Sequence, residues 1–198
     1  MADRAYLARV TGVVLKNLFL NPLAALLESS APDLKNKSFT ITAEAEIPAG
    51  GTDGMIFTQG GFTGGWGFYV QQGKLVGEHS YVAIDRYRVV STEPVPIGKV
   101  TLAMDSKYDG GGMGKGGTIS LFANGRKIGE GRVQQTTPFK YALSEGQNIG
   151  EDTGTGDAGE RIHATQILGP PRTRCGCRWR PAGVWRRRLL LTHSAPWI

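Results

Sequence analysis

Apolar and polar residues alternate along most of the chain between residues 38 and 133. The clearest run lies at 38–47, where apolar residues from Phe39 to Ile47 occupy every second position and Thr or Glu stands between them. Because successive side chains of a β-strand point to opposite faces of the sheet, this period of two predicts a strand with one buried and one wet face. The same pattern predicts strands at 66–70, 85–90, 99–105 and 118–123, a further short strand is expected at 55–59, and 75–81 and 126–133 are expected as hairpin partners.

The stretch 60–74 joins a glycine-rich corner to a strand and that strand to a turn. The glycines at 60, 61, 64 and 65 predict a bend at which a strand passes from one packed sheet to another. Gly73 predicts a hairpin loop with a left-handed residue. The strand between them places Tyr69 on one face and three core side chains on the other, namely Trp66, Phe68 and Val70.

Two further patterns predict a hairpin at 124–125 and the two faces of the strand at 85–90. Asn124-Gly125 is a two-residue turn of the type that needs positive φ at both positions, so 126–133 should return antiparallel. At 85–90, Tyr87 and Val89 alternate with two arginines, Arg86 and Arg88, which should therefore face the opposite way.

About eight strands, mostly linked by hairpins, predict an all-β fold: an antiparallel β-sandwich of jelly-roll type, similar to concanavalin and laminin G domains. Apolar residues at loose helical spacing predict a short helix within 6–27, broken near Pro22. The expected organisation is an N-terminal apolar segment at 1–30, the sandwich at 31–155 and an Arg-rich tail at 156–198.

The net charge of +6 belongs to the tail, since 1–160 carry 15 Lys and Arg against 17 Asp and Glu, while 161–198 carry eight Arg and no acid. A nucleic-acid partner is therefore not expected for the sandwich. Charged and polar residues interrupt the first apolar run, so neither a signal peptide nor a membrane partner is expected, and the default compartment is the cytoplasm. Cys175 and Cys177 are too close for an ordinary disulfide and too few for a zinc site.

Candidate chemistry is sparse. Residues 112–117 match G-x-G-x-x-G, but a strand and not a helix is predicted after them, which argues against a nucleotide site. Carboxylates at 105–109 or at 151–152 could hold calcium, although solvated loop acids are the plainer reading. Trp66 and Tyr69 could stack on a sugar, although aromatic strand residues usually belong to the core. His79, His163 and His193 are far apart and form no catalytic motif.

Several segments together resemble the C-terminal domain of bacterial arylsulfatases. They are Ala31-Pro-Asp-Leu-Lys-Asn-Lys-Ser-Phe-Thr-Ile-Thr-Ala-Glu, Gln59-Gly-Gly, Gly64-Gly-Trp-Gly-Phe-Tyr-Val, Gly73-Lys74, Lys107-Tyr-Asp-Gly-Gly-Gly-Met-Gly-Lys-Gly-Gly-Thr118 and Asn148-Ile-Gly-Glu-Asp-Thr-Gly-Thr155. The resemblance implies a sandwich appended to an α/β catalytic domain. Catalysis in that family uses a cysteine in C-x-[PSA]-x-R, converted to formylglycine, and a calcium or magnesium ion. Neither Cys175 nor Cys177 fits that motif, so the chain is expected to supply no catalytic, cofactor-binding or metal-binding residue.

Three functions follow as hypotheses. The first is a non-catalytic fragment of an arylsulfatase that packs against a sulfatase catalytic domain. The alternative is a stand-alone carbohydrate-binding module, and a third is a nucleic-acid binder that uses the arginines of the tail. The resemblance stops at Thr155, and acids vanish after Glu160, so the chain from about Gly156 onward is expected to be a frame-shifted, disordered replacement of the family's closing strand.

Overall fold

The computed structural model describes residues 6–10, 13–18, 26–143, 145–150 and 175–179. Its secondary structure there consists of strands. In chain order they are β1 (Tyr6–Val10), β2 (Val13–Leu18), β3 (Phe39–Ile47), β4 (Gly54–Gly61), β5 (Gly64–Gln71), β6 (Lys74–Tyr81), β7 (Asp85–Pro94), β8 (Gly98–Tyr108), β9 (Gly117–Ala123), β10 (Arg126–Val133), β11 (Gln147–Ile149) and β12 (Cys175–Trp179).

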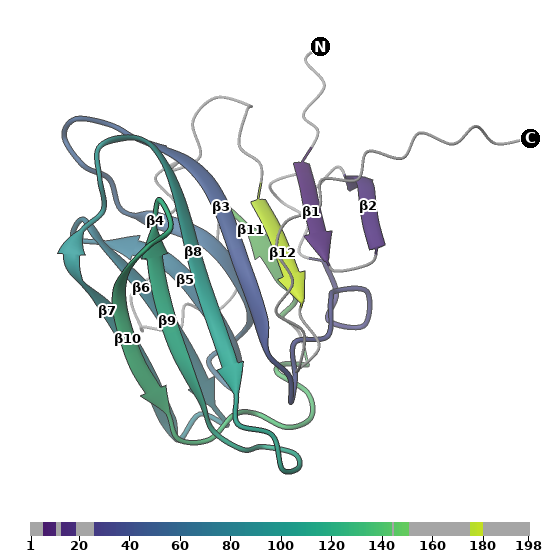
Figure 1. Cartoon of the computed structure of the whole chain (residues 1–198). Coiled ribbons are helices and arrows are strands. Elements are labelled where there is room, and N and C mark those ends of the chain that lie inside the picture. The colour runs from purple at the N-terminus through teal and green to yellow at the C-terminus, as the bar shows by residue number, and fades with distance from the viewer. Residues whose placement is uncertain (1–5, 11–12, 19–25, 144, 151–174, 180–198) are drawn as a thin grey trace, which may run out of the picture.

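Ten of these strands form two five-stranded antiparallel sheets packed face to face (Figure 1). The first sheet has the order β10-β9-β8-β3-β12, and the second has the order β11-β4-β5-β6-β7. A single cluster of buried apolar side chains fills the space between the sheets, with members from Phe39 on β3 to Val133 on β10. The predicted antiparallel β-sandwich is therefore confirmed.

The predicted faces are also found. Along β3, residues from Phe39 to Ile47 are buried at every second position, and the residues between them lie on the outer face. On β5, Trp66, Phe68 and Val70 belong to the main core, whereas Tyr69 belongs to a separate cluster. On β7, Val89 is buried while Arg86 and Arg88 are exposed, as the alternation predicts.

Local turn signals locate the hairpins. Asn124 and Gly125 have φ values of 50° and 80°, and they join β9 to the antiparallel β10. Gln72 and Gly73 have φ values of 51° and 70° between β5 and β6. Positive φ at both turn positions matches the right-handed twist of the flanking strands, which is why these short connections form.

The prediction that the glycine corner at 60–65 carries a strand from one sheet to the other is wrong. The corner closes the hairpin from β4 to β5 within one sheet. Its glycines are needed because the two backbones approach closely. A Cβ at Gly65 would lie 2.2 Å from the carbonyl oxygen of Gln59, and Gly65 has a φ of 145°. Close approach and sheet switching both call for glycine, and sequence alone does not separate them.

The N-terminal helix predicted within 6–27 is not found in the described residues there. β1 and β2 instead pair antiparallel, with Val10 opposite Val13. Val10, Val13 and Val14 are β-branched, which favours strands over helices and outweighs the loose helical spacing of the apolar residues. No helix among the described residues is long and apolar enough to cross a bilayer.

The tail is described only at Cys175–Trp179, which forms the edge strand β12 against Phe39–Ala43 of β3. Over these five residues the predicted disorder is wrong, because the edge of β3 offers backbone groups for pairing. The remaining predictions for 156–198, including the frame shift, lie outside the described residues, as do His163 and His193. So do the acids at 151–152.

Candidate functional site

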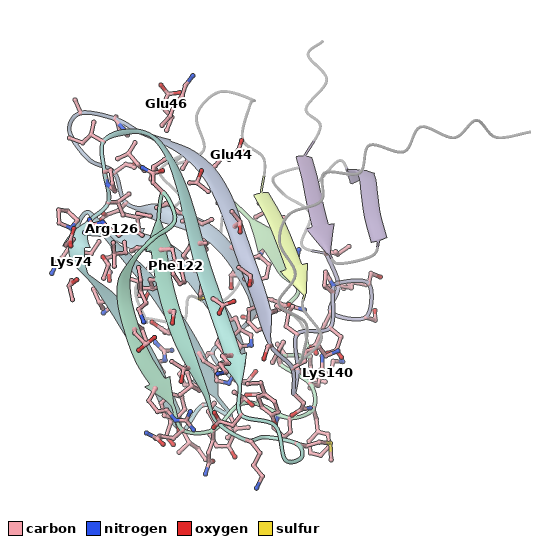
Figure 2. The ribbon with its side chains drawn as sticks, viewed as in Figure 1. Glu44, Glu46, Lys74, Phe122, Arg126 and Lys140 are labelled. Carbon is pink, nitrogen blue, oxygen red and sulfur yellow. The ribbon has the colours of Figure 1, made fainter. Side chains whose placement is uncertain are left out.

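The outer face of the second sheet carries a buried apolar floor of its own. Met55, Tyr69 and Val76, on β4, β5 and β6, form a cluster separate from the main core, and each is less than 5% exposed. The outer face of the first sheet is different, because residues such as Glu44 and Glu46 project from it into solvent (Figure 2). Met55, Tyr69 and Val76 are already covered within the chain, so any ligand on the outer face of the second sheet would meet the polar groups above them.

Glu78 lies on this floor. It is 3% exposed, and its Oε2 atom accepts a hydrogen bond of 2.7 Å from the Tyr69 hydroxyl. Its Oε1 atom is buried and has no hydrogen-bond partner within the described part of the chain. The unpaired amide oxygens of Gln59 and Gln147 differ, because they lie in the inward-facing row of Trp66. Glu78 therefore presents an unused acceptor on the outer face.

Two arginines flank this carboxylate. Strand pairing places Arg88 opposite Glu78 and Arg86 opposite Ser80, so both guanidinium groups lie on the outer face of β7. Arg86 Nη1 is 3.9 Å from Glu78 Oε1, and Arg88 Nε is 3.9 Å from Glu78 Oε2. Both separations exceed hydrogen-bond length, so the arginines supply charge near Glu78 without satisfying its oxygens.

Each arginine also lies over an aromatic ring. The guanidinium carbon of Arg88 is 5.9 Å from the centre of the Tyr69 ring, and Arg88 donates a hydrogen bond to Gln71. The guanidinium carbon of Arg86 is 5.3 Å from the centre of the Phe62 ring. Phe62, at the tip of the β4–β5 hairpin, is 48% exposed, and its carbonyl oxygen accepts a hydrogen bond of 2.7 Å from the Ser80 hydroxyl.

We call these six residues the outer-face cluster: Phe62, Tyr69, Gln71, Glu78, Arg86 and Arg88. The cluster combines two sets of guanidinium donors, a buried carboxylate oxygen without a hydrogen-bond partner among the described residues, and a half-exposed aromatic ring. That combination suits a polyhydroxylated ligand, because hydroxyl groups both donate and accept hydrogen bonds and sugar C–H faces pack on aromatic rings.

Trp66 is not available to a ligand. Its side chain is 3% exposed, its ring meets that of Phe39 edge to face at 5.1 Å, and its Nε1–H donates a hydrogen bond of 3.0 Å to the Tyr141 hydroxyl. The suggested sugar stacking by Trp66 is therefore wrong, and its bulk belongs to the core. Tyr69 does lie on the outer face, but it presents its hydroxyl to Glu78 and not an open ring.

His79 is buried between the sheets. Its ring centre is 4.2 Å from that of Trp66, and its Nε2 atom accepts a hydrogen bond of 3.0 Å from the backbone N–H of Thr137. Burial lowers the pKa of His79 to about 3, so the imidazole is neutral at physiological pH. A neutral, fully buried histidine packed against Trp66 is part of the core.

The carboxylates at 105–109 are not brought together around a cation. Asp105 accepts a hydrogen bond of 2.5 Å from the Thr40 hydroxyl on the outer face of the first sheet. Asp109 forms an ion pair with Arg132. Within the described ranges, no three His, Cys, Asp or Glu side chains are placed to share a metal ion.

The glycine loop that matches G-x-G-x-x-G is followed by β9, as predicted, and not by a helix. Asn36 holds the loop in place: its Oδ1 accepts a hydrogen bond of 2.8 Å from the N–H of Gly114, and its Nδ2 donates one of 2.8 Å to the carbonyl of Pro138. These contacts give the loop a structural role and leave no helix N-terminus for a phosphate.

One end of the sandwich also has exposed apolar side chains beside the loop that carries Lys140 (Figure 2). Leu27, Phe139 and Leu143 are 66%, 68% and 91% exposed. They border two shallow grooves of about 510 and 460 Å³ that share Lys140, Ala142, Leu143 and Glu145.

Sequence reasoning named only Tyr69 among the outer-face cluster as a possible ligand contact. The alternation at 85–90 does show that Arg86 and Arg88 share a face. The acidic Glu78, within a predicted strand whose other residues are mostly apolar or small, could also have been recognised from the sequence as a candidate site residue. The contacts between them depend on the register of three strands, which local patterns do not determine.

Comparison with known proteins supports the fold. No family model matches the chain, and no curated protein matches it. Among solved structures, the chain is similar to the Ruminococcus gnavus IT-sialidase CBM40 bound to α2,3-sialyllactose, with a TM-score of 0.50 and 14% identity over 81% of this chain and 91% of that one. It also matches domains LG4–5 of the mouse laminin α1 chain, with a TM-score of 0.49 and 12% identity, covering 81% of this chain and 41% of that one. A pentraxin from Limulus polyphemus matches with a TM-score of 0.34 and 14% identity over 70% of this chain and 64% of that one.

None of these three proteins is a sulfatase. The CBM40 match covers 81% of this chain and 91% of that one, so the two share a β-sandwich fold. At 14% identity the likeness carries no residue roles from one protein to the other.

Proposed function

We propose that this chain is a carbohydrate-binding module with a jelly-roll type sandwich, which holds a saccharide on the outer face of β5, β6 and β7. The observation that carries the proposal is the buried Oε1 atom of Glu78, which has no hydrogen-bond partner among the described residues. Leaving a buried acceptor unpaired costs on the order of 1 to 3 kcal/mol, and more when the acceptor is charged. A ligand hydroxyl that donates to this atom would recover that cost.

The surroundings of Glu78 fit a sugar better than an apolar ligand. The Tyr69 hydroxyl fixes the carboxylate, so the unpaired oxygen is held in one place before the ligand arrives. Such preorganisation reduces the entropic cost of binding. The half-exposed ring of Phe62 offers apolar surface next to these polar groups. The similarity in fold to a CBM40 that was solved with a sialylated sugar also supports a carbohydrate ligand.

The test is binding of the purified full chain to a broad glycan array, followed by titration calorimetry with the best ligand. Glu78→Gln keeps the shape of the side chain but removes its charge, so we expect affinity to fall about ten- to hundredfold. The matched control is Glu46→Gln on the outer face of the first sheet, which should bind as the parent does. Both variants should keep the parent's melting temperature within a few degrees.

An array on which no glycan binds the folded parent would exclude this function. A sugar that binds the parent and Glu78→Gln with equal affinity would exclude the proposed site on the outer face, because the ligand would then lie elsewhere on the molecule.

A second candidate is the one implied by the motifs at 31–155: the companion sandwich of an arylsulfatase, packed against its catalytic domain. The exposed Leu27, Phe139 and Leu143 favour it, because apolar side chains gathered at one end suit a domain contact. We expect the chain alone to hydrolyse no aryl sulfate, since Cys175 and Cys177 lack the formylglycine motif. Release of the phenol from a chromogenic aryl sulfate, above the rate of a mock preparation, would contradict this expectation.

A further inference from the structure

We propose that the saccharide bound on the outer face is anionic, and that Arg86 is the residue that binds its acidic group. This inference rests on the proposed carbohydrate-binding function and adds the chemical class of the ligand. It starts from a difference between the two arginines of the outer-face cluster, which lie two residues apart on β7.

Arg88 already has partners for its guanidinium group. It donates a hydrogen bond to Gln71 and lies over the ring of Tyr69. These contacts hold Arg88 near Glu78 Oε2, on the side of the carboxylate that the Tyr69 hydroxyl occupies. We therefore assign Arg88 a positioning role beside Tyr69 and Glu78.

Arg86 also lies over an aromatic ring, that of Phe62, but among the described residues it lacks a hydrogen bond of the kind that Arg88 makes to Gln71. Its guanidinium makes no hydrogen bond to any residue that the structure describes, and its nearest carboxylate oxygen is Glu78 Oε1 at 3.9 Å. The side chain is 31% exposed, so part of the guanidinium remains accessible, and its central carbon lies 5.3 Å from the centre of the Phe62 ring. A guanidinium held in this way is prepared for two parallel hydrogen bonds to a carboxylate or a sulfate ester.

The charge balance also favours an anion. Arg86 and Arg88 face a single carboxylate, Glu78, so the cluster has one excess positive charge. Asp85 lies on the other face of β7, because alternation turns it away from Arg86 and toward Tyr87, whose pKa is raised by burial and by the charge of Asp85. An anion next to Arg86 is therefore attracted by the net charge of the cluster.

The open oxygen of Glu78 restricts the ligand further. A simple anion such as inorganic sulfate has no hydrogen-bond donor at neutral pH, so it would leave Glu78 Oε1 unpaired and would be repelled by its charge. An acidic sugar carries hydroxyl donors next to its acidic group, so one ligand can satisfy Arg86 and Glu78 together. Carboxylated and sulfated sugars share this chemistry, and the experiment separates them.

The experiment measures affinity of the full chain for three related sugars by titration calorimetry: lactose, sialyllactose and lactose that carries a sulfate ester. The same comparison runs across all pairs of neutral and acidic glycans on the array. We expect the acidic member to bind at least tenfold more tightly at low salt, and this preference to shrink as salt is raised because screening weakens charge attraction. The preferred acid identifies the source as carboxylate or sulfate.

The variant Arg86→Gln should remove the preference for acidic sugars while leaving residual binding of the neutral sugar, because the Glu78 acceptor is still present. Arg126→Gln, at the exposed ion pair with Glu93, is the matched control and should keep the preference. Circular dichroism and melting temperature confirm that each variant is folded.

The two proposals fail in different ways. If neutral and acidic sugars bind alike, or if Arg86→Gln keeps the preference, the anionic ligand is excluded while carbohydrate binding stands. If Glu78→Gln leaves every binding sugar unaffected, the location on the outer face is excluded for both.

Discussion

Glu78 and His79 are neighbours on β6 whose side chains point to opposite faces of one sheet. Both are buried, and each is held by a single well-placed hydrogen bond. Glu78 faces outward, toward two arginines that leave one of its oxygens open. His79 faces inward, against Trp66 in the core. Adjacent polar residues thus serve different purposes, because the strand period assigns one to a surface and the other to the interior.

His79 makes the stability of the sandwich depend on pH. Burial lowers its pKa from 6.5 to about 3, so in moderately acidic solution the unfolded chain binds a proton that the folded chain does not. The stability that a neutral His79 preserves is fully present above pH 6.5 and is lost progressively as pH falls toward 3. The slope should approach about 1.4 kcal/mol per pH unit.

The measurement is urea unfolding of the full chain at several pH values between about 4.5 and 6.5, a window in which ordinary carboxylates remain mostly ionised. The variant His79→Gln has no titrating group at this position, so its free energy of unfolding should vary much less over the window. Equal slopes for parent and variant would show that His79 is already accessible to protons in the folded state.

Among the elements, the strands with one wet face could be predicted from sequence, because alternation and turn residues are local signals. β3, β9 and β10 follow their predicted ranges closely for this reason. β4 gave a weaker signal, since all eight of its residues are buried and neither face shows polar alternation. β11 has three residues, too few to establish any period.

The N-terminal hairpin illustrates the limit of periodicity. Apolar residues of 6–18 fit both a helical stripe and two short strands, and only pairing between β1 and β2 decides between them. Periodicity was also insufficient to predict the outer-face cluster. Local alternation places Arg86 and Arg88 on one face, but their position around Glu78 requires β5, β6 and β7 to be in register. Contacts between strands of this kind are not encoded in any single segment.

At the scale of the whole molecule, the first residue and the last strand of the region 26–150 lie side by side. Leu26 bridges to Gln147 through two backbone hydrogen bonds of 2.9 and 2.7 Å, so the start of 26–150 is fastened to its last strand, β11. Near the opposite edge of the sandwich, the Thr92 hydroxyl of β7 donates to the carbonyl of Ile128 on β10 and links the two sheets. The region 26–150 therefore contains both layers of the core and its own closure.

β12 is the exception, because it comes from outside 26–150 and covers the edge of β3 over Phe39–Ala43. We expect a fragment of residues 26–150 to fold, since the core cluster lies within it, but to expose this part of the edge. Unpaired strand edges recruit other chains, and the acidic Glu44 and Glu46 protect only the half that β12 leaves open.

The fragment 26–150 should therefore self-associate at concentrations where a longer fragment, 26–179, is monomeric. Sedimentation velocity across a concentration series compares the two, and circular dichroism with a thermal melt establishes that both are folded. The reason for the difference is physical: five residues of β3 regain backbone partners only by pairing with β12 or with a second chain. A folded 26–150 that stays monomeric over the same range would show that β12 does not protect the β3 edge, and a 26–150 without a cooperative melt would show that the closure at Leu26 and Gln147 is not sufficient for folding.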